Sequence, residues 1–326
     1  MQTTVFDSLK DQKQLDTVLA KGGEGSVYPL ADRPEVLVKC YHTEILAKNG
    51  PTLRHKIEAM TKVKAQFGHP AMSWPLIDVF DTNQEWIGYA MRRVSGVKLH
   101  FLAHALLYKK HFPTLNRQQL VQILLNLVQM VQQLHAQQVM IGDYNLNNFL
   151  CDPSTLAVGL IDCDSYQIQI GSTRYPCPVG SPDLTPLEHH GTAYANVIRN
   201  PASESFSLAI ILFKCLMLGR HPYDVLDGED PVSNLKAGRF AYGIGNKGIP
   251  TGDWYNIWSH MPHRIKSMFI QTFVDGATDP TQRPTLDAWH EALTVYGKEL
   301  DKGWHESAIR PTHPKASNRR SSGSQG

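Results

Sequence analysis

Few cysteines are present, and none is arranged as a paired or metal-binding motif. The five cysteines are widely spaced and include no Cys-x-x-Cys pair; they are Cys40, Cys151, Cys163, Cys177 and Cys215. An odd number of isolated cysteines argues against a disulfide framework and against a zinc site. We therefore expect reduced thiols and a cytoplasmic location.

A charge excess and a long apolar segment are also absent. The chain has 32 basic and 30 acidic residues, and this net charge of +2 gives no general electrostatic reason to expect nucleic acid or an anionic membrane as a partner. The longest apolar run, from Phe206 to Gly219, is interrupted by Lys214 and is too short to cross a bilayer. The N-terminus lacks the pattern of a signal peptide. We expect no membrane span.

The apolar content is sufficient for a large core. Hydrophobic residues make up 42% of the 326 residues, which can bury one large core or two lobes of about 100 and about 200 residues. From residue 307 onward the sequence consists mostly of Pro, Ser, Asn, Arg and Gly without apolar periodicity. This composition predicts a disordered, basic, Ser-rich tail at 307–326.

A glycine-rich turn followed by a lysine lies near the N-terminus. Residues 19–28 read Leu-Ala-Lys-Gly-Gly-Glu-Gly-Ser-Val-Tyr, and a short β-rich run at 35–40 contains Lys39. Glycines at 22, 23 and 25 would let backbone amides approach phosphate oxygens, because a Cβ would block that approach. The glycines alone equally fit an ordinary hairpin turn, but Lys39 follows at the spacing of a phosphate-contacting lysine.

A charged amphipathic helix is expected after the Gly50-Pro51 pair. Between residues 52 and 67, charged residues alternate with apolar ones at helical spacing. Glu58 lies nineteen residues beyond Lys39 within this segment. Taken alone, Glu58 could simply be a solvent-facing charge on a surface helix.

Three polar residues follow in the middle of the chain. Asp143 and Asn148 belong to Ile-Gly-Asp-Tyr-Asn-Leu-Asn-Asn, and Asp162 follows fourteen residues later in Leu-Ile-Asp-Cys-Asp. One carboxylate can orient a hydroxyl, while an amide and a second carboxylate can hold magnesium on the phosphates of a nucleotide. Phosphoryl transfer requires this division of roles, so the pattern indicates a kinase-type catalytic loop and metal-binding turn.

The surrounding periodicity predicts two long helices and a lobe boundary. Leucines and valines recur every three or four residues between 115 and 136, and the run 205–218 is nearly all apolar; both patterns favour core helices. Residues 86–94 read as a strand that ends at Ser95-Gly96. We therefore expect the lobe boundary near residue 94.

With these motifs in this order, the chain resembles the eukaryotic-type protein kinase superfamily over most of its length, from Gly22 to Thr285. The resemblance implies an α+β, bilobal protein-kinase-like fold. It places a small β-rich N-lobe at 1–94 and a larger helical C-lobe at 95–306. It also implies ATP and Mg²⁺ (or Mn²⁺) as cofactors.

The same resemblance assigns roles to single residues. Lys39 corresponds to the lysine that contacts the phosphates, Glu58 to its helix partner, and Met91 to the residue that gates the adenine pocket. The phosphate-covering loop corresponds to Gly22, Gly23, Gly25 and Val27. The catalytic aspartate corresponds to Asp143 and the metal ligands to Asn148 and Asp162, with Asp164 as a further candidate ligand.

Two later motifs distinguish protein kinases from small-molecule kinases. Residues 180–188 resemble the stretch that ends in Ala-Pro-Glu, and 279–285 resemble the segment around a buried arginine. The resemblance implies an ion pair between Glu188 and Arg283. Kinases of the aminoglycoside and choline type share the Gly-Asp-x-x-x-x-Asn and Ile-Asp-x-Asp patterns but lack these two motifs.

Several positions depart from the superfamily pattern. Gly142 replaces an arginine that receives activation-loop phosphate, so we expect no activation by loop phosphorylation. Asn145 replaces a lysine near the transferring phosphate, which predicts low activity. The remaining departures are Ala20 for a loop glycine, Cys163 and Asp164 for Phe-Gly, and Glu204 for an aspartate.

A narrower resemblance concerns Ile-Asp-Cys-Asp-Ser-Tyr-Gln and Gly-Ser-Pro-Asp-Leu-Thr-Pro-Leu-Glu. Both look like the bacterial kinase of the tellurite-resistance-associated triad, which implies a von Willebrand A domain protein and a PP2C phosphatase as partners. The leading hypothesis is a protein serine/threonine kinase that phosphorylates a protein substrate and autophosphorylates. The alternatives are a pseudokinase scaffold and a small-molecule kinase.

Overall fold

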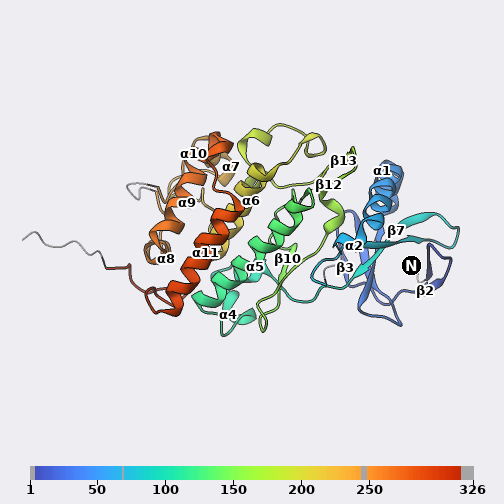
Figure 1. The fold of residues 1–326 in the computed structure, drawn as a ribbon, viewed down its shortest axis with the longest axis horizontal. Coiled ribbons are helices and arrows are strands. Elements are labelled where there is room, and N and C mark those ends of the chain that lie inside the picture. The colour runs from blue at the N-terminus through green and yellow to red at the C-terminus, as the bar shows by residue number, and fades with distance from the viewer. Residues whose placement is uncertain (1–3, 68–69, 244–247, 317–326) are drawn as a thin grey trace, which may run out of the picture. The chain divides into compact units, whose positions relative to one another are not determined.

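The computed structural model describes residues 4–67, 70–243 and 248–316 (Figure 1). The chain divides into two compact units. The first unit comprises Met1–Leu99, Gln133–Ser181 and Thr192–Arg199, and the second comprises His100–Gln132, Pro182–Gly191 and Asn200–Gly326. The predicted lobe ranges, 1–94 and 95–306, stay a prediction.

A seven-stranded antiparallel sheet dominates the first unit. Its strand order is β2-β1-β6-β7-β5-β4-β3. The strands are β1 (Thr4–Asp7), β2 (Gln12–Gln14), β3 (Ala20–Lys21), β4 (Gly25–Pro29), β5 (Val36–Tyr41), β6 (Pro75–Phe80) and β7 (Trp86–Arg92). Alternating apolar side chains on these strands build a buried cluster that includes Val5, Val38 and Val79. The predicted glycine hairpin corresponds to β3 and β4, and β5 follows it.

Two small three-stranded sheets complete the strands of the first unit. One has the order β11-β10-β8 and the other β13-β12-β9. Their strands are β8 (Val97–Lys98), β9 (Val139–Met140), β10 (Phe149–Cys151), β11 (Val158–Leu160), β12 (Gln167–Ile170) and β13 (Thr173–Tyr175). The segments that connect these strands contain the predicted catalytic residue Asp143 and the predicted metal ligands Asn148, Asp162 and Asp164.

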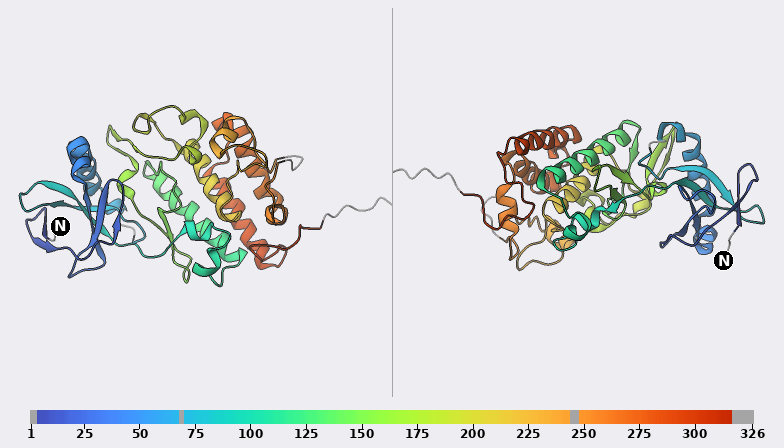
Figure 2. Two further views of the ribbon diagram at one scale, coloured as in Figure 1. Left: turned by 180° about the vertical axis from the view of Figure 1, so that it is seen from behind. Right: turned by 90° about the horizontal axis from the view of Figure 1, so that it is seen from below.

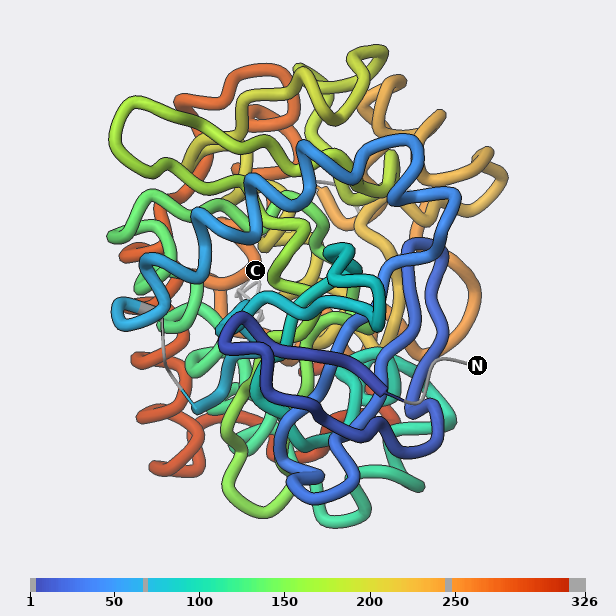
Figure 3. Tube along the Cα trace, turned by 90° about the vertical axis from the view of Figure 1, so that its right-hand side faces the viewer, coloured from blue at the N-terminus to red at the C-terminus, as the bar shows by residue number. Residues whose placement is uncertain are grey.

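Helix α1 (Thr43–Lys62) packs against β6 and β7 along one side of the large sheet (Figure 3). The sequence predicted that a helix would begin only after Gly50-Pro51, and this start was wrong. Pro51 lies inside the helix. It removes one backbone hydrogen bond, but the helix keeps an apolar face with Ile57 and Met60 fully buried. A short helix, α2 (Lys64–Phe67), follows.

The second unit is helical apart from its turns. Its central helix α6 (Pro201–Leu216) is almost entirely buried, and α9 (His263–Phe273) packs against both α6 and α11 (Leu286–Asp301) (Figures 1 and 2). The remaining helices of the described chain are α3 (Leu99–Leu102), α4 (Tyr108–His111), α5 (Arg117–Ala136), α7 (Pro231–Lys236), α8 (Trp254–His260) and α10 (Asp275–Thr278). The helices predicted at 115–136 and 205–218 correspond to α5 and α6.

A capping motif explains why α6 begins at residue 201 rather than at 205. The Asn200 side chain accepts hydrogen bonds from the backbone amides of Ala202 and Ser203, both at 3.0 Å. The Ser203 hydroxyl in turn accepts from the Asn200 amide at 3.0 Å. Pro201 at the first helical position has no amide hydrogen to lose.

The segment that follows α11 makes hydrogen bonds within the second unit. Arg117 at the start of α5 is buried, and its guanidinium donates hydrogen bonds to the carbonyls of Ala308 at 3.1 Å and Ile309 at 2.9 Å. Ile309 is itself buried. A buried guanidinium needs such carbonyl acceptors. Further along, α8 contacts the carbonyls of Thr312 and His313 through Asn256 at 3.1 Å and His260 at 3.1 Å. Residues 317–326 lie outside the described residues, and the disordered tail at 307–326 stays a prediction.

The fold class agrees with the prediction. An antiparallel sheet with one helix against it and a set of packed helices make an α+β protein. Over the described ranges, no helix is both long enough and apolar enough to span a membrane. All five cysteines are free.

Candidate functional site

Lys39 lies near the middle of the first unit's sheet. Strand β5 pairs with β4 and β7, so that Lys39 lies opposite Val27 and Tyr89. The side chain is only 6% exposed. Its Nζ atom lies 2.6 Å from Asp164 Oδ2, 2.9 Å from Asp162 Oδ1 and 3.9 Å from Glu24 Oε2. One ammonium group is thus surrounded by three carboxylates.

These carboxylates control the protonation of Lys39. Burial by itself would lower the pKa of the Lys39 ammonium, but the charges of Asp164 and Asp162 and their hydrogen bonds raise it above its ordinary value. Lys39 is therefore positively charged at neutral pH. An anionic group that enters this site would meet a permanent cation.

The two aspartates that contact Lys39 differ in exposure. Asp164 is 4% exposed and also accepts a hydrogen bond from the Tyr41 hydroxyl at 2.7 Å. Tyr41 lies two residues after Lys39 on β5, on the same face of the strand. Burial would raise the pKa of Asp164, but the charge of Lys39 and these hydrogen bonds lower it. The Asp162 side chain, in contrast, is 49% exposed.

The turn after β11 presents both aspartates. Asp162 adopts a left-handed backbone conformation with φ of 62°, and a one-turn 3₁₀ helix, Cys163–Ser165, follows. The Ser165 hydroxyl donates to the Asp162 carbonyl at 3.0 Å, which fixes this turn. Aspartate tolerates the left-handed region better than most residues.

The β10–β11 hairpin places Asn148 beside this turn. The Ile161 amide donates to the Asn148 carbonyl at 3.0 Å, so that Asn148 precedes β10 where Asp162 follows β11. The loop before it is held by local hydrogen bonds, including that from the Asn145 amide to the Asp143 carbonyl at 2.9 Å. Asp143, Asn148 and Asp162 thus belong to one local structure.

The glycine turn joins β3 to β4. The Gly22 amide donates to the Gly25 carbonyl at 2.9 Å, which closes the turn. A Cβ on Gly25 would lie 2.5 Å from the Cys40 carbonyl oxygen, so Gly25 is required by the close approach of β5. A Cβ on Gly23 would meet open space. Burial raises the pKa of Glu24 at the tip of this turn, although the charge of Lys39 lowers it.

The expected ion pair between Lys39 and Glu58 is not formed. Glu58 accepts a hydrogen bond from Arg54 at 2.8 Å on the outer side of α1, and its side chain is 36% exposed. The residue on the buried face is Lys56, which donates to the Pro176 carbonyl at 3.1 Å. Two residues correspond to about 200° around a helix, so Glu58 and Lys56 point in opposite directions.

Lys56 is therefore a second buried lysine near Lys39. Burial lowers the pKa of Lys56 to about 8, and the nearby charge of Lys39 lowers it further, while the charges of Asp164 and Glu24 act in the opposite direction. These interactions put Lys56 within electrostatic reach of Lys39 and Asp164. No local pattern in the sequence indicates this arrangement, because it depends on where α1 begins.

Arg199 is a second residue that no sequence motif indicated. It is buried and donates hydrogen bonds to the carbonyls of Cys177 at 2.8 Å and Val179 at 2.9 Å. A Cβ on Gly142 would lie 2.6 Å from Arg199 Nε and 2.7 Å from Cys177 Sγ. The space beside Gly142 is thus occupied by Arg199, which anchors the segment around residue 178.

The predicted ion pair in the second unit is confirmed. Arg283 donates to Glu188 Oε1 at 2.6 Å and to Glu188 Oε2 at 2.8 Å, and it also donates to the Gly276 carbonyl at 2.7 Å. Burial would raise the pKa of Glu188, but the hydrogen bonds and charge of Arg283 lower it. The pair is bidentate, and the guanidinium is fully buried.

Met91 is buried on β7 between β5 and β6, opposite Leu37 and Pro75. Its predicted role at an adenine pocket stays a prediction. No three His, Cys, Asp or Glu side chains gather as a metal site within the described ranges.

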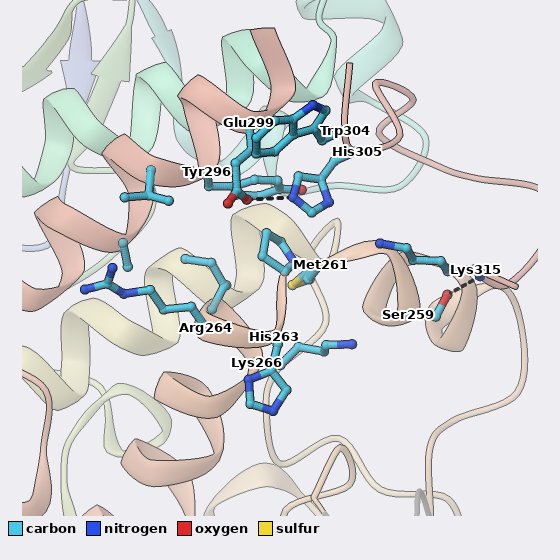
Figure 4. A pocket seen from close by; sticks show the side chains of 14 residues that line it. Ser259, Met261, His263, Arg264, Lys266, Tyr296, Glu299, Trp304, His305 and Lys315 are labelled. Carbon is cyan, nitrogen blue, oxygen red and sulfur yellow. Dashed lines mark hydrogen bonds and ion pairs between the residues drawn. The ribbon is translucent and has the colours of Figure 1, made fainter. Parts of the chain in front are cut away.

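A pocket of about 620 Å³ lies elsewhere, within the second unit (Figure 4). None of the predicted site residues lines it. His305 and Glu299 meet on its upper side at 2.7 Å, and the Lys315 amide donates to the Ser259 hydroxyl at 2.8 Å. The segment that follows α11 therefore forms part of its wall.

Comparisons with known proteins agree with the motifs. No protein-family model matches the chain. The chain is 28% identical over 309 residues to "Protein kinase YegI" of Escherichia coli strain K12, and 28% identical over 313 residues to the protein of the same name from Escherichia coli O157:H7. These alignments cover 91% and 93% of this chain but 47% of each relative, so the chain spans about half the length of the curated relatives it matches. The chain is a kinase-like protein with a bilobal α+β fold.

Proposed function

We propose that this chain is an ATP- and magnesium-dependent protein kinase that phosphorylates serine or threonine. The observation that carries the proposal is the 2.9 Å contact between Lys39 and Asp162. A lysine of the sheet and an exposed aspartate of the turn after β11 meet, although 123 residues separate them in sequence. Phosphoryl transfer depends on such a lysine and such an aspartate acting on the same phosphates.

Each residue of the first unit has a distinct task in this proposal. Lys39 binds phosphate oxygens with its permanent charge, and the backbone amides of the glycine turn near Gly23 donate hydrogen bonds to them. Asp143 orients the acceptor hydroxyl and accepts its proton. Because transfer spreads negative charge over the phosphoryl oxygens, a buried cation in a water-poor site stabilises the transition state more than a solvated one would.

The available donors fit magnesium. Asn148 and Asp162 offer an amide oxygen and a carboxylate from neighbouring ends of one hairpin, and the Asp162 side chain is accessible. Mg²⁺ prefers oxygen ligands and usually combines one or two protein groups with phosphates and water. When bound, the metal would supply charge neutralisation on the phosphates.

A protein is the proposed acceptor. The Glu188–Arg283 pair supports this assignment, because the two motifs that contain it separate protein kinases from the small-molecule kinases with similar loops. By the narrower sequence resemblance, we propose a von Willebrand A domain protein and a PP2C phosphatase as partners. A cytoplasmic location and autophosphorylation belong to the same proposal.

A scaffold without efficient transfer is the second candidate. The carboxylate of Glu24 lies 3.9 Å from Lys39 Nζ, where it competes with phosphate for the cation. Asn145 also supplies no charge to the phosphates. A nucleotide-binding pseudokinase would have the same fold and the same partners.

The deciding experiment measures phosphate transfer directly. Purified protein is incubated with γ-labelled ATP, with and without Mg²⁺, alone and with a generic protein acceptor. The Asp143→Ala and Lys39→Ala variants are compared with Glu58→Gln, which changes a carboxylate on the outer side of α1. Phosphosites are then mapped by mass spectrometry.

Three outcomes separate the hypotheses. Mg²⁺-dependent label on serine or threonine that disappears in the first two variants, but not in Glu58→Gln, supports the kinase. Nucleotide binding without label in the wild type supports the scaffold. Label on an added amino-sugar or alcohol, and not on protein, supports a small-molecule kinase.

A further inference from the structure

The partner of Lys39 does not come from the helix that the superfamily resemblance indicates. Glu58 is bound to Arg54 and points outward from α1. The buried face of α1 presents Lys56, which has the same charge as Lys39. Helix α1 therefore supplies no carboxylate from this face, and the cation must be neutralised by another element.

Asp164 is the buried carboxylate at Lys39. Its Oδ2 atom receives both the Lys39 ammonium at 2.6 Å and the Tyr41 hydroxyl at 2.7 Å. With 4% exposure it has little access to solvent. Two donors of one strand thus hold a single carboxylate oxygen, which is the arrangement expected of a fixed counter-ion.

Asp162 differs in each of these respects. Its side chain is about half exposed, and its contact with Lys39 is longer, at 2.9 Å. An exposed carboxylate can exchange one cation for another at little cost, because water compensates for the broken contact. Asp162 can therefore turn to a metal ion while Asp164 continues to neutralise Lys39.

We propose that Asp164 is the positioning residue that holds Lys39 against the nucleotide phosphates, in the place expected for Glu58, and that it is not a metal ligand. The inference rests on the proposed function, since it concerns the same phosphate-binding lysine. In this arrangement Asp164 is the counter-ion of Lys39, and Asp162 remains available to bind the metal.

This assignment changes what controls the site. In protein kinases the lysine is positioned by a helix glutamate, so that movement of the helix switches activity. Here the lysine and its counter-ion belong to β5 and to the turn after β11. A displacement of α1 would therefore leave the Lys39–Asp164 pair intact.

Charge relocation provides a sharp test. Asp164→Asn and Asp164→Gly remove the carboxylate, and Glu58→Gln is the matched control on α1. In the Asp164→Gly background, Lys56→Glu returns a carboxylate to the buried face of α1, while Lys56→Gln only removes the positive charge. Each variant is checked by thermal unfolding, and kcat and KM for ATP are measured.

The proposal expects at least a tenfold loss of kcat in both Asp164 variants, together with a rise in KM for ATP, because Lys39 is no longer held against the phosphates. Glu58→Gln should retain the wild-type kcat. Lys56→Glu should restore kcat at least fivefold over Asp164→Gly, and Lys56→Gln should not. A folded Asp164→Asn variant with a kcat within twofold of wild type would overturn the proposal.

A second readout separates this inference from the proposed function. If the wild type transfers no phosphate, the proposed function fails. The variants are then compared by a ratio of two dissociation constants measured without metal, the constant for adenosine divided by the constant for ATP. This ratio reports phosphate contacts by Lys39. A ratio at least fivefold lower in Asp164→Asn, and recovered in Asp164→Gly with Lys56→Glu, supports the positioning role. An unchanged ratio overturns it.

Discussion

Two buried cations of this chain, Lys39 in the first unit and Arg283 in the second, are paired with carboxylates in opposite ways. Arg283 has one carboxylate, which it binds through both oxygens, and the carbonyls of Gly276 and Ala202 accept two further hydrogen bonds from it. Lys39 has three carboxylates, and those of Glu24 and Asp162 are 39% and 49% exposed. The arginine is held by one bidentate partner, whereas the lysine has separate partners that can leave.

The difference separates a structural ion pair from a site built for exchange. A bidentate buried ion pair stabilises one conformation, and both of its carboxylate oxygens are already bound to the guanidinium. A buried cation with several partly exposed partners can exchange one carboxylate for a phosphate and still be paired with the others. Substitutions at the two cations should therefore affect different properties of the protein.

The largest effect is expected on catalysis at Lys39. Lys39→Met removes the cation that faces the phosphates and should lower the rate of phosphate transfer by about 10²- to 10³-fold. The rate is measured with saturating ATP. Circular dichroism should show retained secondary structure. A loss below fivefold would mean that Lys39 does not contact the transferring group.

The second unit should instead lose stability. Glu188→Gln leaves the fully buried Arg283 guanidinium without its counter-ion and should lower the free energy of unfolding by about 3 kcal/mol. Urea denaturation measures this loss, and Glu58→Gln, on a surface pair, should change it by about 0.5 kcal/mol or less.

The pH dependence of the same variant has a defined sign. The pKa of Glu188 is lowered in the folded state, so its stabilisation is complete above the ordinary value of 4.5 and is lost as the pH falls through the lowered value. The stability difference between wild type and Glu188→Gln should therefore shrink in strong acid. A constant difference down to pH 3 would contradict the ion-pair explanation.

An effect of intermediate size on the free energy of unfolding is expected at His221, a buried group without a counter-ion among the described residues. Burial lowers the pKa of His221 to about 3; its Nδ1 accepts from the Tyr223 amide, and its Nε2 donates to the Asp183 carbonyl. Below an unfolded pKa of about 6.5 the unfolded chain binds one more proton, so stability falls as the pH falls. From pH 7.5 to 5 this histidine should remove about 2 kcal/mol of unfolding free energy.

Parallel urea titrations of wild type and His221→Gln check this value. The glutamine amide can still donate to the Asp183 carbonyl but does not titrate. Between pH 7.5 and 5, the variant should lose about 2 kcal/mol less unfolding free energy than the wild type. Equal slopes would show that His221 accepts a proton without unfolding.

The smallest effect is expected at the exposed partner of Lys39. Glu24→Gln removes a carboxylate that competes with phosphate and should tighten ATP binding about two- to fivefold, since exposed pairs contribute about 0.2–1 kcal/mol. Isothermal titration calorimetry measures the dissociation constant. Weaker binding in this variant would show that Glu24 assists the nucleotide instead of competing with it.

Local pattern predicted most elements of this fold. The glycine hairpin, the strand with Lys39 and the helices α5 and α6 follow from turn residues and apolar periodicity, which act over short distances. The Glu188–Arg283 pair was also predicted, because two motifs fixed both ends. The roles of Asp143, Asn148 and Asp162 were inferred from their spacing and stay a prediction.

The counter-ion of Lys39 could not be predicted in this way. The expected partner, Glu58, was chosen by distance along the sequence, but the facing residue depends on the start and phase of α1. Pro51 suggested a boundary that the helix does not have. A one-position error turns a helix by about 100°, so the partner of a buried lysine is set by tertiary packing.

The glycine at position 142 has a consequence for how this protein can change in evolution. Arg199 Nε and Cys177 Sγ occupy the volume beside it, at 2.6 Å and 2.7 Å from where a Cβ would lie. An arginine at 142 would require the Arg199 and Cys177 side chains to move, and it would have to adopt a left-handed backbone with φ of 75°, which favours glycine. Restoring a phosphate-binding arginine at this position would therefore take repacking around Arg199 as well as the substitution itself.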